Sequence, residues 1–210
     1  AGGGGELEKV FSVFEEMGAR GLEPDRACFN ALMRACARAG EADRCSELIR
    51  VMVAEPYLLT PDVITYTTLI KALGAARRVD EAEEVFQQMM QRSNHFAVFT
   101  PPNEVTFAEL MHANLRASRP ARALALFADL RSKRHAAAVP FGPTLTSWRW
   151  ALQACEQLGD GRRALALHDA LQAQGNVRLD NPSLLSLVRV LERSGLHEAA
   201  AHVRQSRSRL

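Results

Sequence analysis

The sequence predicts an all-α protein, a solenoid built from repeated helix-turn-helix units, and three observations lead to this fold class. Apolar residues recur three or four positions apart through most of the chain, which is the spacing of one face of an α-helix. Ala, Leu, Arg and Glu are abundant, and only 6% of the residues are aromatic. A pattern of two helices and a turn also repeats along the 210 residues. Because each unit of a solenoid contacts only its neighbours, we expect one domain over residues 1–210.

The clearest unit lies at residues 62–90. Its first helix is expected over residues 62–73, with an apolar face formed by Tyr66, Leu69, Ile70 and Leu73. Its second helix is expected over residues 79–90, with an apolar face formed by Ala82, Val85, Phe86 and Met89. Neither helix can bury its apolar face alone, so we expect neighbouring copies of the unit.

Copies of this unit occur along the chain. The apolar pair of the first helix occurs as Leu32-Met33, Leu69-Ile70, Leu110-Met111, Ala151-Leu152 and Leu187-Val188. A small residue recurs in the second helix at Cys45, Ala82, Ala123, Ala164 and Ala200, which predicts that helices approach closely there. The predicted units are residues 6–25 (partial), 26–62, 63–103, 104–144, 145–180 and 181–210 (partial). The chain begins without Met inside a unit that lacks its first helix, so we expect further sequence upstream.

Residues that end or begin helices support these boundaries. Gly40, Gly159 and Gly195 stand where first helices should end, which is typical of left-handed C-terminal caps. Pro120 stands where the second helix of residues 104–144 should begin, a position that proline tolerates.

Three connections between units are longer than the rest: residues 54–61, 92–103 and 133–144. Insertions in solenoids map to loops on one face, so we expect these three to line one edge together. Three of their aromatic residues have two interpretations, as contacts to a partner or as side chains folded back over helix ends: Phe96, Phe99 and Phe141.

The sequence shows no catalytic, metal-binding or cofactor-binding pattern. The cysteines lack Cys-x-x-Cys spacing and are interpreted as buried thiols in a reducing compartment: Cys28, Cys36, Cys45 and Cys155. His197 and His202 are not one helical turn apart, and His168 occupies a core position. We therefore expect no enzyme and no cofactor. No apolar run approaches the roughly 20 residues that span a membrane, so no membrane partner is expected.

The length and the turn residues of the unit identify the type of repeat. Met17, Met52 and Met89 lie 35 and 37 residues apart, and the later copies lie 41 apart, compared with roughly 34 for tetratricopeptide repeats. The links Gly21-Leu22-Glu23-Pro24-Asp25 and Thr60-Pro61-Asp62, with the helices at residues 62–70 and 80–89, resemble the pentatricopeptide repeat family. The resemblance covers residues 6–91 best, then 104–180, with a trace at 181–203. It implies a right-handed superhelical solenoid.

The resemblance also implies a function. Members of this family bind single-stranded RNA, with about one base per repeat read by two or three side chains. The base-reading pairs would be Asn30 with Asp62, Thr67 with Asn103, Ala108 with Thr144, and Arg149 with Asp180. In the family's pattern the first pair favours uracil and the second adenine, and the last two depart from it. The residues that would sandwich the bases are Ala27, Ile64, Val105 and Thr146.

Binding of RNA also requires cations near the backbone phosphates. Arg38, Arg116 and Arg193 share one position near the end of the first helix, and they are either phosphate contacts or ordinary solvated helix ends. The formal net charge of +2 is too small for a sequence-blind electrostatic binder. It is compatible with base-specific reading.

Two classes of function therefore compete. In the first, the chain binds mRNA or rRNA in a mitochondrion or chloroplast, along the concave groove of the solenoid, and supports RNA processing, stability or translation. In the second, it is a structural subunit of an organellar ribosome or transcription complex. Its loops 54–61, 92–103 and 133–144 would then contact rRNA and neighbouring subunits. The departures at Ala108 and Arg149 favour the second class more than an intact array would.

Overall fold

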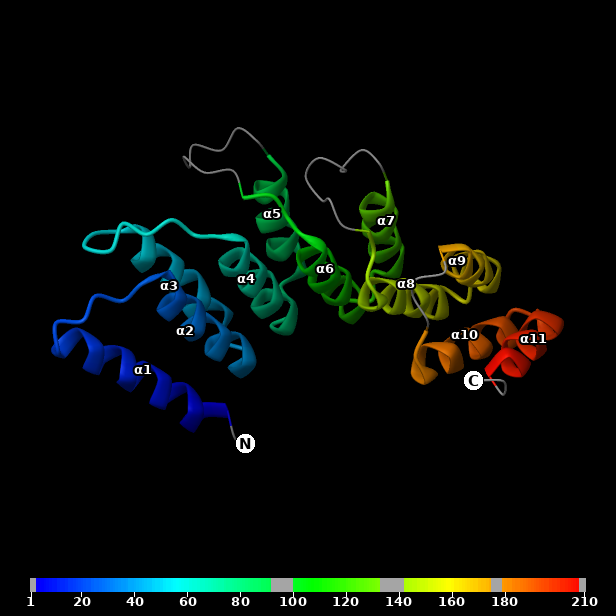
Figure 1. Ribbon diagram of the computed structural model, residues 1–210, viewed down its shortest axis with the longest axis horizontal. Coiled ribbons are helices and arrows are strands. Elements are labelled where there is room, and N and C mark those ends of the chain that lie inside the picture. Colours follow the sequence, from blue (N-terminus) through cyan, green and yellow to red (C-terminus); the bar gives the residue numbers. More distant parts are fainter. Residues whose placement is uncertain (1–2, 92–99, 133–141, 175–178, 208–210) are drawn as a thin grey trace. The chain divides into compact units, whose positions relative to one another are not determined.

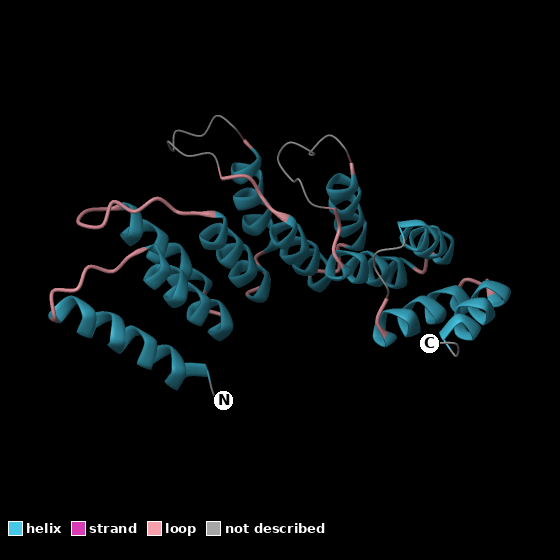
Figure 2. Cartoon of the chain, in the orientation of Figure 1, coloured by secondary structure: helices cyan, strands magenta, loops and turns pink. Residues whose placement is uncertain are grey.

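The computed structural model describes residues 3–91, 100–132, 142–174 and 179–207, and these residues form α-helices and no strand (Figures 1 and 2). The helices are α1 (Gly3–Ala19), α2 (Arg26–Ala39), α3 (Ala42–Val53), α4 (Val63–Ala75), α5 (Val79–Met90), α6 (Glu104–Arg116), α7 (Pro120–Arg131), α8 (Leu145–Leu158), α9 (Gly161–Gln174), α10 (Asn181–Arg193) and α11 (His197–Arg207). The predicted all-α class is confirmed.

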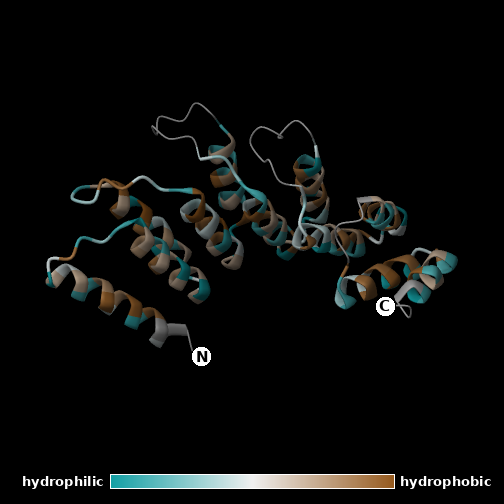
Figure 3. Cartoon of the chain, in the orientation of Figure 1, coloured by the Kyte–Doolittle hydropathy of each residue, from teal (hydrophilic) through white to brown (hydrophobic). Residues whose placement is uncertain are grey.

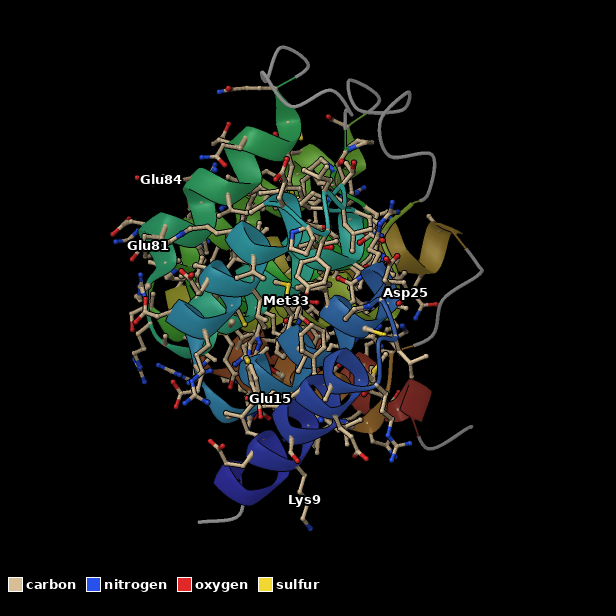
Figure 4. All side chains as sticks on the ribbon, turned by 90° about the vertical axis from the view of Figure 1, so that its left-hand side faces the viewer. Lys9, Glu15, Asp25, Met33, Glu81 and Glu84 are labelled. Atoms are coloured by element: carbon tan, nitrogen blue, oxygen red, sulfur yellow. The ribbon has the colours of Figure 1, made fainter. Side chains whose placement is uncertain are left out.

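The core is built from the positions that repeat in the sequence. The apolar pair of the first helix is buried in all five copies, and the small residue of the second helix is at most 1% exposed in all five. Polar and apolar residues occupy different faces of the same helices (Figure 3). Glu81 and Glu84 of α5 are exposed and point outward, whereas Met33 of α2 is buried (Figure 4). Burial of one stripe per helix is what an amphipathic repeat requires.

The contacts divide the chain into two compact units, residues 1–113 and residues 114–210. In unit 1, α2 packs against α1, α3 and α4, and α4 packs against α3 and α5. In unit 2, α8 packs against α7, α9 and α10, and α10 packs against α9 and α11. First helices of consecutive repeats therefore lie side by side within each unit. A single solenoid domain over residues 1–210 stays a prediction.

The predicted helix ends are confirmed. Gly40 and Gly159 end α2 and α8 in the left-handed conformation, with φ of 79° and 67°, and Gly195 follows α10 with φ of 75°. Glycine adopts this conformation without the steric cost of a Cβ atom. Pro120 is the first residue of α7.

The connection at residues 54–61 folds against unit 1. The Tyr57 ring meets the Phe29 ring edge-on, with centroids 5.1 Å apart, and the Leu59 amide donates to the Met52 carbonyl over 2.8 Å. Most of the other two long connections, with Phe96, Phe99 and Phe141, lies outside the described residues. A common edge formed by all three therefore stays a prediction.

Cysteine and histidine take structural positions. Cys36, Cys45 and Cys155 are buried and Cys28 is half-buried, and His168 is 7% exposed in unit 2. Within the described ranges, no group of three or more metal-binding side chains is present. No helix in these ranges is long and apolar enough to cross a membrane.

Candidate nucleic-acid interface

A cavity of about 400 Å³ opens on the first helices of unit 1. Its walls come from α2, α4 and the start of α6. Five predicted site residues line it: Arg38, Ile64, Thr67, Asn103 and Val105. The fold therefore brings one predicted base-reading pair, two predicted sandwich residues and one predicted phosphate contact to a single place.

The pair Thr67 and Asn103 is held at the cavity through the cap of α6. The Asn103 side-chain oxygen accepts from the Thr106 amide and from the Thr106 hydroxyl, both over 3.0 Å. The Thr67 hydroxyl lies 2.7 Å from the Thr106 hydroxyl. A hydroxyl carries one hydrogen. Because Thr106 can donate its single hydrogen to Asn103 or to Thr67, either hydroxyl can be the donor between Thr67 and Thr106.

The pair Asn30 and Asp62 is in direct contact but less accessible. The Asn30 amide donates to Asp62 Oδ1 over 3.3 Å and its oxygen accepts from the Thr65 hydroxyl over 2.8 Å. Asp62 in turn caps α4 by accepting from the Thr65 amide over 3.0 Å. Asn30 is only 3% exposed. Asn30 is therefore a buried residue whose hydrogen bonds support the next repeat, and it is also a candidate for base contact. We call the first residue of each predicted base-reading pair the reader of its repeat.

Hydrogen bonds keep the Asp62 carboxylate ionised. Burial raises the pKa of Asp62, but the amide and hydroxyl of Thr65, the amide of Asn30 and the charge of Arg26 together hold the pKa below its ordinary value. The Arg26 guanidinium lies 3.8 Å from the second carboxylate oxygen. A negative charge therefore persists at this cap at neutral pH.

The predicted sandwich residues are on the surface. Ile64 and Val105 are 46% and 51% exposed at the cavity, and Ala27 and Thr146 are also exposed. The apolar side chains of Ile64 and Val105, left open to solvent at one repeat position, provide a surface on which a planar ring can lie.

The last two predicted pairs are arranged differently. Ala108 is 5% exposed in unit 1 and offers no polar side chain, whereas Thr144 is exposed in unit 2. In the fourth repeat, the Arg149 guanidinium lies over the Trp150 ring, 4.7 Å from its centre. Hydrogen bonds from Ser183 and then the charge of Arg149 lower the pKa of Asp180 below its ordinary value.

The three predicted phosphate contacts are exposed. Arg38 lies at the rim of the cavity on α2, while Arg116 and Arg193 stand in the last turns of α6 and α10. Their exposure is compatible both with phosphate contacts and with ordinary solvated helix ends.

Sequence reasoning missed three charged residues of the cavity: Arg34, Lys71 and Glu109. Lys71 Nζ lies 3.2 Å from Glu109 Oε1, linking α4 to α6. A signal was present, because Arg34 and Lys71 lie four residues after Asn30 and Thr67 and so face the same side one helical turn later. The cavity therefore holds more cationic groups than the arginine row alone predicts.

Comparison with known families identifies the repeat. A family model described as the pentacotripeptide-repeat region of PRORP matches residues 4–133. The chain belongs to the pentatricopeptide repeat family. The predicted fold, an all-α solenoid of pentatricopeptide repeats, is thereby confirmed.

Relatives within the family come from Arabidopsis thaliana. A chloroplastic pentatricopeptide repeat-containing protein is 37% identical over 82 residues, which is 39% of this chain and 14% of that protein. Another pentatricopeptide repeat-containing protein is 32% identical over 195 residues, which is 92% of this chain and 33% of that protein. A third, described as putative and mitochondrial, is 40% identical over 77 residues, which is 37% of this chain and 12% of that protein. The chain thus spans a third or less of these relatives.

Solved pentatricopeptide structures share the fold. The crystal structure of PPR10 in complex with an 18-nt psaJ RNA element matches all of this chain and 28% of PPR10, with a TM-score of 0.79 and 19% identity. The PPR domain of Arabidopsis thaliana protein-only RNase P 1, in complex with tRNA, matches 86% of this chain and 87% of that domain, with a TM-score of 0.65 and 18% identity.

Proposed function

We propose that this pentatricopeptide chain binds single-stranded RNA along the first helices of its repeats, with about one base for each repeat. The observation that carries the proposal is the cavity of unit 1, which Thr67 and Asn103, linked through Thr106, line together with Ile64 and Val105. A cavity of about 400 Å³ has room for a nucleobase, and bases splayed from a single strand are recognised by stacking and by hydrogen bonds to their edges.

The chemistry of the cavity suits a base joined to a phosphate backbone. Ile64 and Val105 offer apolar surface to the faces of a ring, while Thr67 and Asn103 offer polar groups to its edge. Arg34, Arg38 and Lys71 line the same cavity and supply positive charge for the adjacent phosphates. Glu109 offsets one of these charges through Lys71, which favours selective over charge-driven binding.

The relatives support an organellar role. Several are named as chloroplastic or mitochondrial proteins, and three of the similar structures contain RNA. The proposed role is to support RNA processing, stability or translation in a mitochondrion or chloroplast. Although PRORP structures are among the similar folds, we propose that this segment contributes RNA recognition without a catalytic site.

Selection from a random single-stranded RNA pool at near-physiological salt tests the proposal. We expect enrichment of a short uracil-then-adenine core, bound by the pairs Asn30 with Asp62 and Thr67 with Asn103. The Thr67→Ala variant should change the preference at the adenine position alone. A folded, helical protein that enriches no sequence would contradict the proposal.

The same selection distinguishes the proposed function from a second candidate, in which the chain is a structural subunit of an organellar ribosome or transcription complex. That candidate is favoured by the non-matching readers Ala108 and Arg149. It predicts that RNA association survives Thr67→Ala and depends on the connections at residues 54–61, 92–103 and 133–144. A variant in which residues 92–103 are shortened to the length of the link at residues 21–24 tests this dependence. The second candidate predicts that this variant loses RNA association.

A further inference from the structure

The fourth repeat presents an arginine beside an aromatic ring where the first two repeats present Asn30 and Thr67. The Arg149 guanidinium carbon lies 4.7 Å from the centre of the Trp150 ring, close enough for a cation–π contact. Trp150 occupies the repeat position of Thr68 and Glu109, both of which line the cavity of unit 1. The repeat therefore assigns Trp150 to the base-facing side of α8.

The arginine also lacks a hydrogen bond that the readers of the first two repeats make. There, the hydroxyl three residues after the cap is bonded to the reader, as in the 2.8 Å bond from Thr65 to Asn30. The equivalent hydroxyl in the fourth repeat belongs to Ser183. Ser183 Oγ makes no hydrogen bond to Arg149, and Arg149 Nε is buried without a hydrogen-bond partner among the described residues.

Unpaired buried groups of this kind are unfavourable. An acceptor brought to Arg149 Nε would satisfy one of them. The Arg149 guanidinium lies over the Trp150 ring, and its planar fork of N–H groups suits bidentate recognition.

The carboxylate of Asp180 limits which chemical groups can bind beside Arg149. It caps α10 by accepting from the Ser183 amide over 3.1 Å, and the charge of Arg149 helps to lower its pKa. Asp180 occupies the repeat position of Asp62, whose Oδ1 accepts from Asn30 over 3.3 Å. A carboxylate at this position disfavours a phosphate group. It favours a neutral ring that presents acceptors to Arg149 and N–H donors to Asp180.

The geometry points to a guanine-selective position in the fourth repeat, formed by Arg149, Trp150 and Asp180. Guanine carries O6 and N7 on one edge, the arrangement that an arginine fork binds through two hydrogen bonds. Its N1–H and N2–H groups are donors for a carboxylate, and its ring can stack on an aromatic or guanidinium plane. This inference rests on the proposed function, because it names the base that one further repeat takes.

Single-stranded RNAs with a uracil-adenine core test it. Each RNA carries one of the four bases two nucleotides beyond the adenine, which leaves the intervening nucleotide for the third repeat. The affinity of residues 1–210 for each RNA is measured by fluorescence anisotropy, with the core placed in both strand polarities. We expect guanine to be bound about tenfold more tightly than adenine at this position. The Arg149→Lys variant keeps the charge but loses the planar fork, so it should abolish the guanine preference.

A matched control is Arg162→Lys on the exposed side of α9, which should leave all four affinities unchanged. Circular dichroism confirms that both variants fold. Binding of the uracil-adenine core without any preference at the fourth position would overturn the guanine assignment and leave the proposed function standing. A third variant, Arg149→Ala, tests for a phosphate contact. If Arg149→Ala weakens the affinity for all four RNAs equally and Arg149→Lys does not, Arg149 contacts a phosphate, and the guanine assignment is also overturned. Failure to bind any RNA would overturn both.

Discussion

The Thr65 hydroxyl donates to the side-chain oxygen of Asn30 over 2.8 Å, joining the cap of one repeat to the reader of the repeat before it. The same two positions meet again at Thr106 and Thr67, where the hydroxyls are 2.7 Å apart. The predicted base-reading residues and the helix caps therefore share one hydrogen-bond network in unit 1. A change at a reader should alter stability as well as specificity.

Asn30→Ala should destabilise the protein by about 1–3 kcal/mol, because it removes the 2.8 Å bond from the Thr65 hydroxyl and the 3.3 Å bond to Asp62, which together join two repeats. Urea unfolding followed by circular dichroism measures this change. Arg34→Ala, on the exposed side of the same helix, is the control and should change stability by no more than about 0.5 kcal/mol. Equal effects of the two substitutions would argue against the shared network.

Gly74→Ala should destabilise unit 1, although alanine is the better helix former. A Cβ atom at residue 74 would lie 2.7 Å from the Ala113 Cβ, so α4 and α6 would have to move apart. We expect a loss of about 1–3 kcal/mol from overpacking. Thermal unfolding monitored by circular dichroism measures it.

Two further variants isolate the steric cause. Gly18→Ala in α1 has open space around it and should stabilise the protein by up to about 1 kcal/mol. Adding Ala113→Gly to Gly74→Ala should restore much of the lost stability. No recovery in this double variant would exclude the close approach of residues 74 and 113 as the cause.

Stability should fall at mildly acidic pH because of His168. Burial lowers the pKa of this histidine below its ordinary value of 6.5, against an opposing effect of Asp169. The unfolded chain then binds the proton more tightly than the folded protein, so stability is complete above about pH 6.5 and decreases as the pH falls below it. Urea unfolding at pH 7.5 and pH 5 should show this loss.

His168→Phe supplies the side chain that α5 and α7 carry at this position, Phe86 and Phe127. It should reduce the difference in stability between pH 7.5 and pH 5. His197→Gln, at an exposed histidine, should leave that difference unchanged. The same pH dependence in wild type and His168→Phe would assign it to other groups.

Truncating the apolar rim of the cavity should weaken RNA binding without unfolding the protein. In the double variant Ile64→Ala and Val105→Ala, both side chains are about half exposed, so little core packing is lost. We expect about a tenfold weaker affinity for the uracil-adenine RNA, from about 1–2 kcal/mol of lost apolar contact. Leu58→Ala, 67% exposed on the connection at residues 54–61, is the control. If the double variant and Leu58→Ala bind the RNA with equal affinity, Ile64 and Val105 are not part of the RNA-binding site.

Periodicity in the sequence was enough to predict the core and the helix ends. The repeated apolar pairs and the small residues at Cys45 and Ala82 are buried because stacked helices require small side chains at their crossing points. Gly40 and Gly159 adopt the left-handed conformation that glycine tolerates best. These features depend on local spacing, which the sequence shows directly.

The candidate site was only partly predictable, because it depends on contacts between repeats. The burial of Asn30 follows from partners on the next repeat, Asp62 and Thr65, and a polar residue satisfied in this way has no signature of its own. The position of the Arg149 side chain over Trp150 likewise depends on side-chain packing. Spacing places such residues on a face and leaves their orientation open.

Moving one reader pair to another repeat tests the central proposal most directly. The double variant Thr67→Asn and Asn103→Asp gives the second repeat the same pair as the first, and aspartate retains the capping oxygen that asparagine supplies to α6. Affinities of wild type and variant are compared for two RNAs that differ only in the second base of the core, uracil-adenine and uracil-uracil. Wild type should prefer uracil-adenine and the variant uracil-uracil. An unchanged preference in a folded variant would contradict base reading by Thr67 and Asn103.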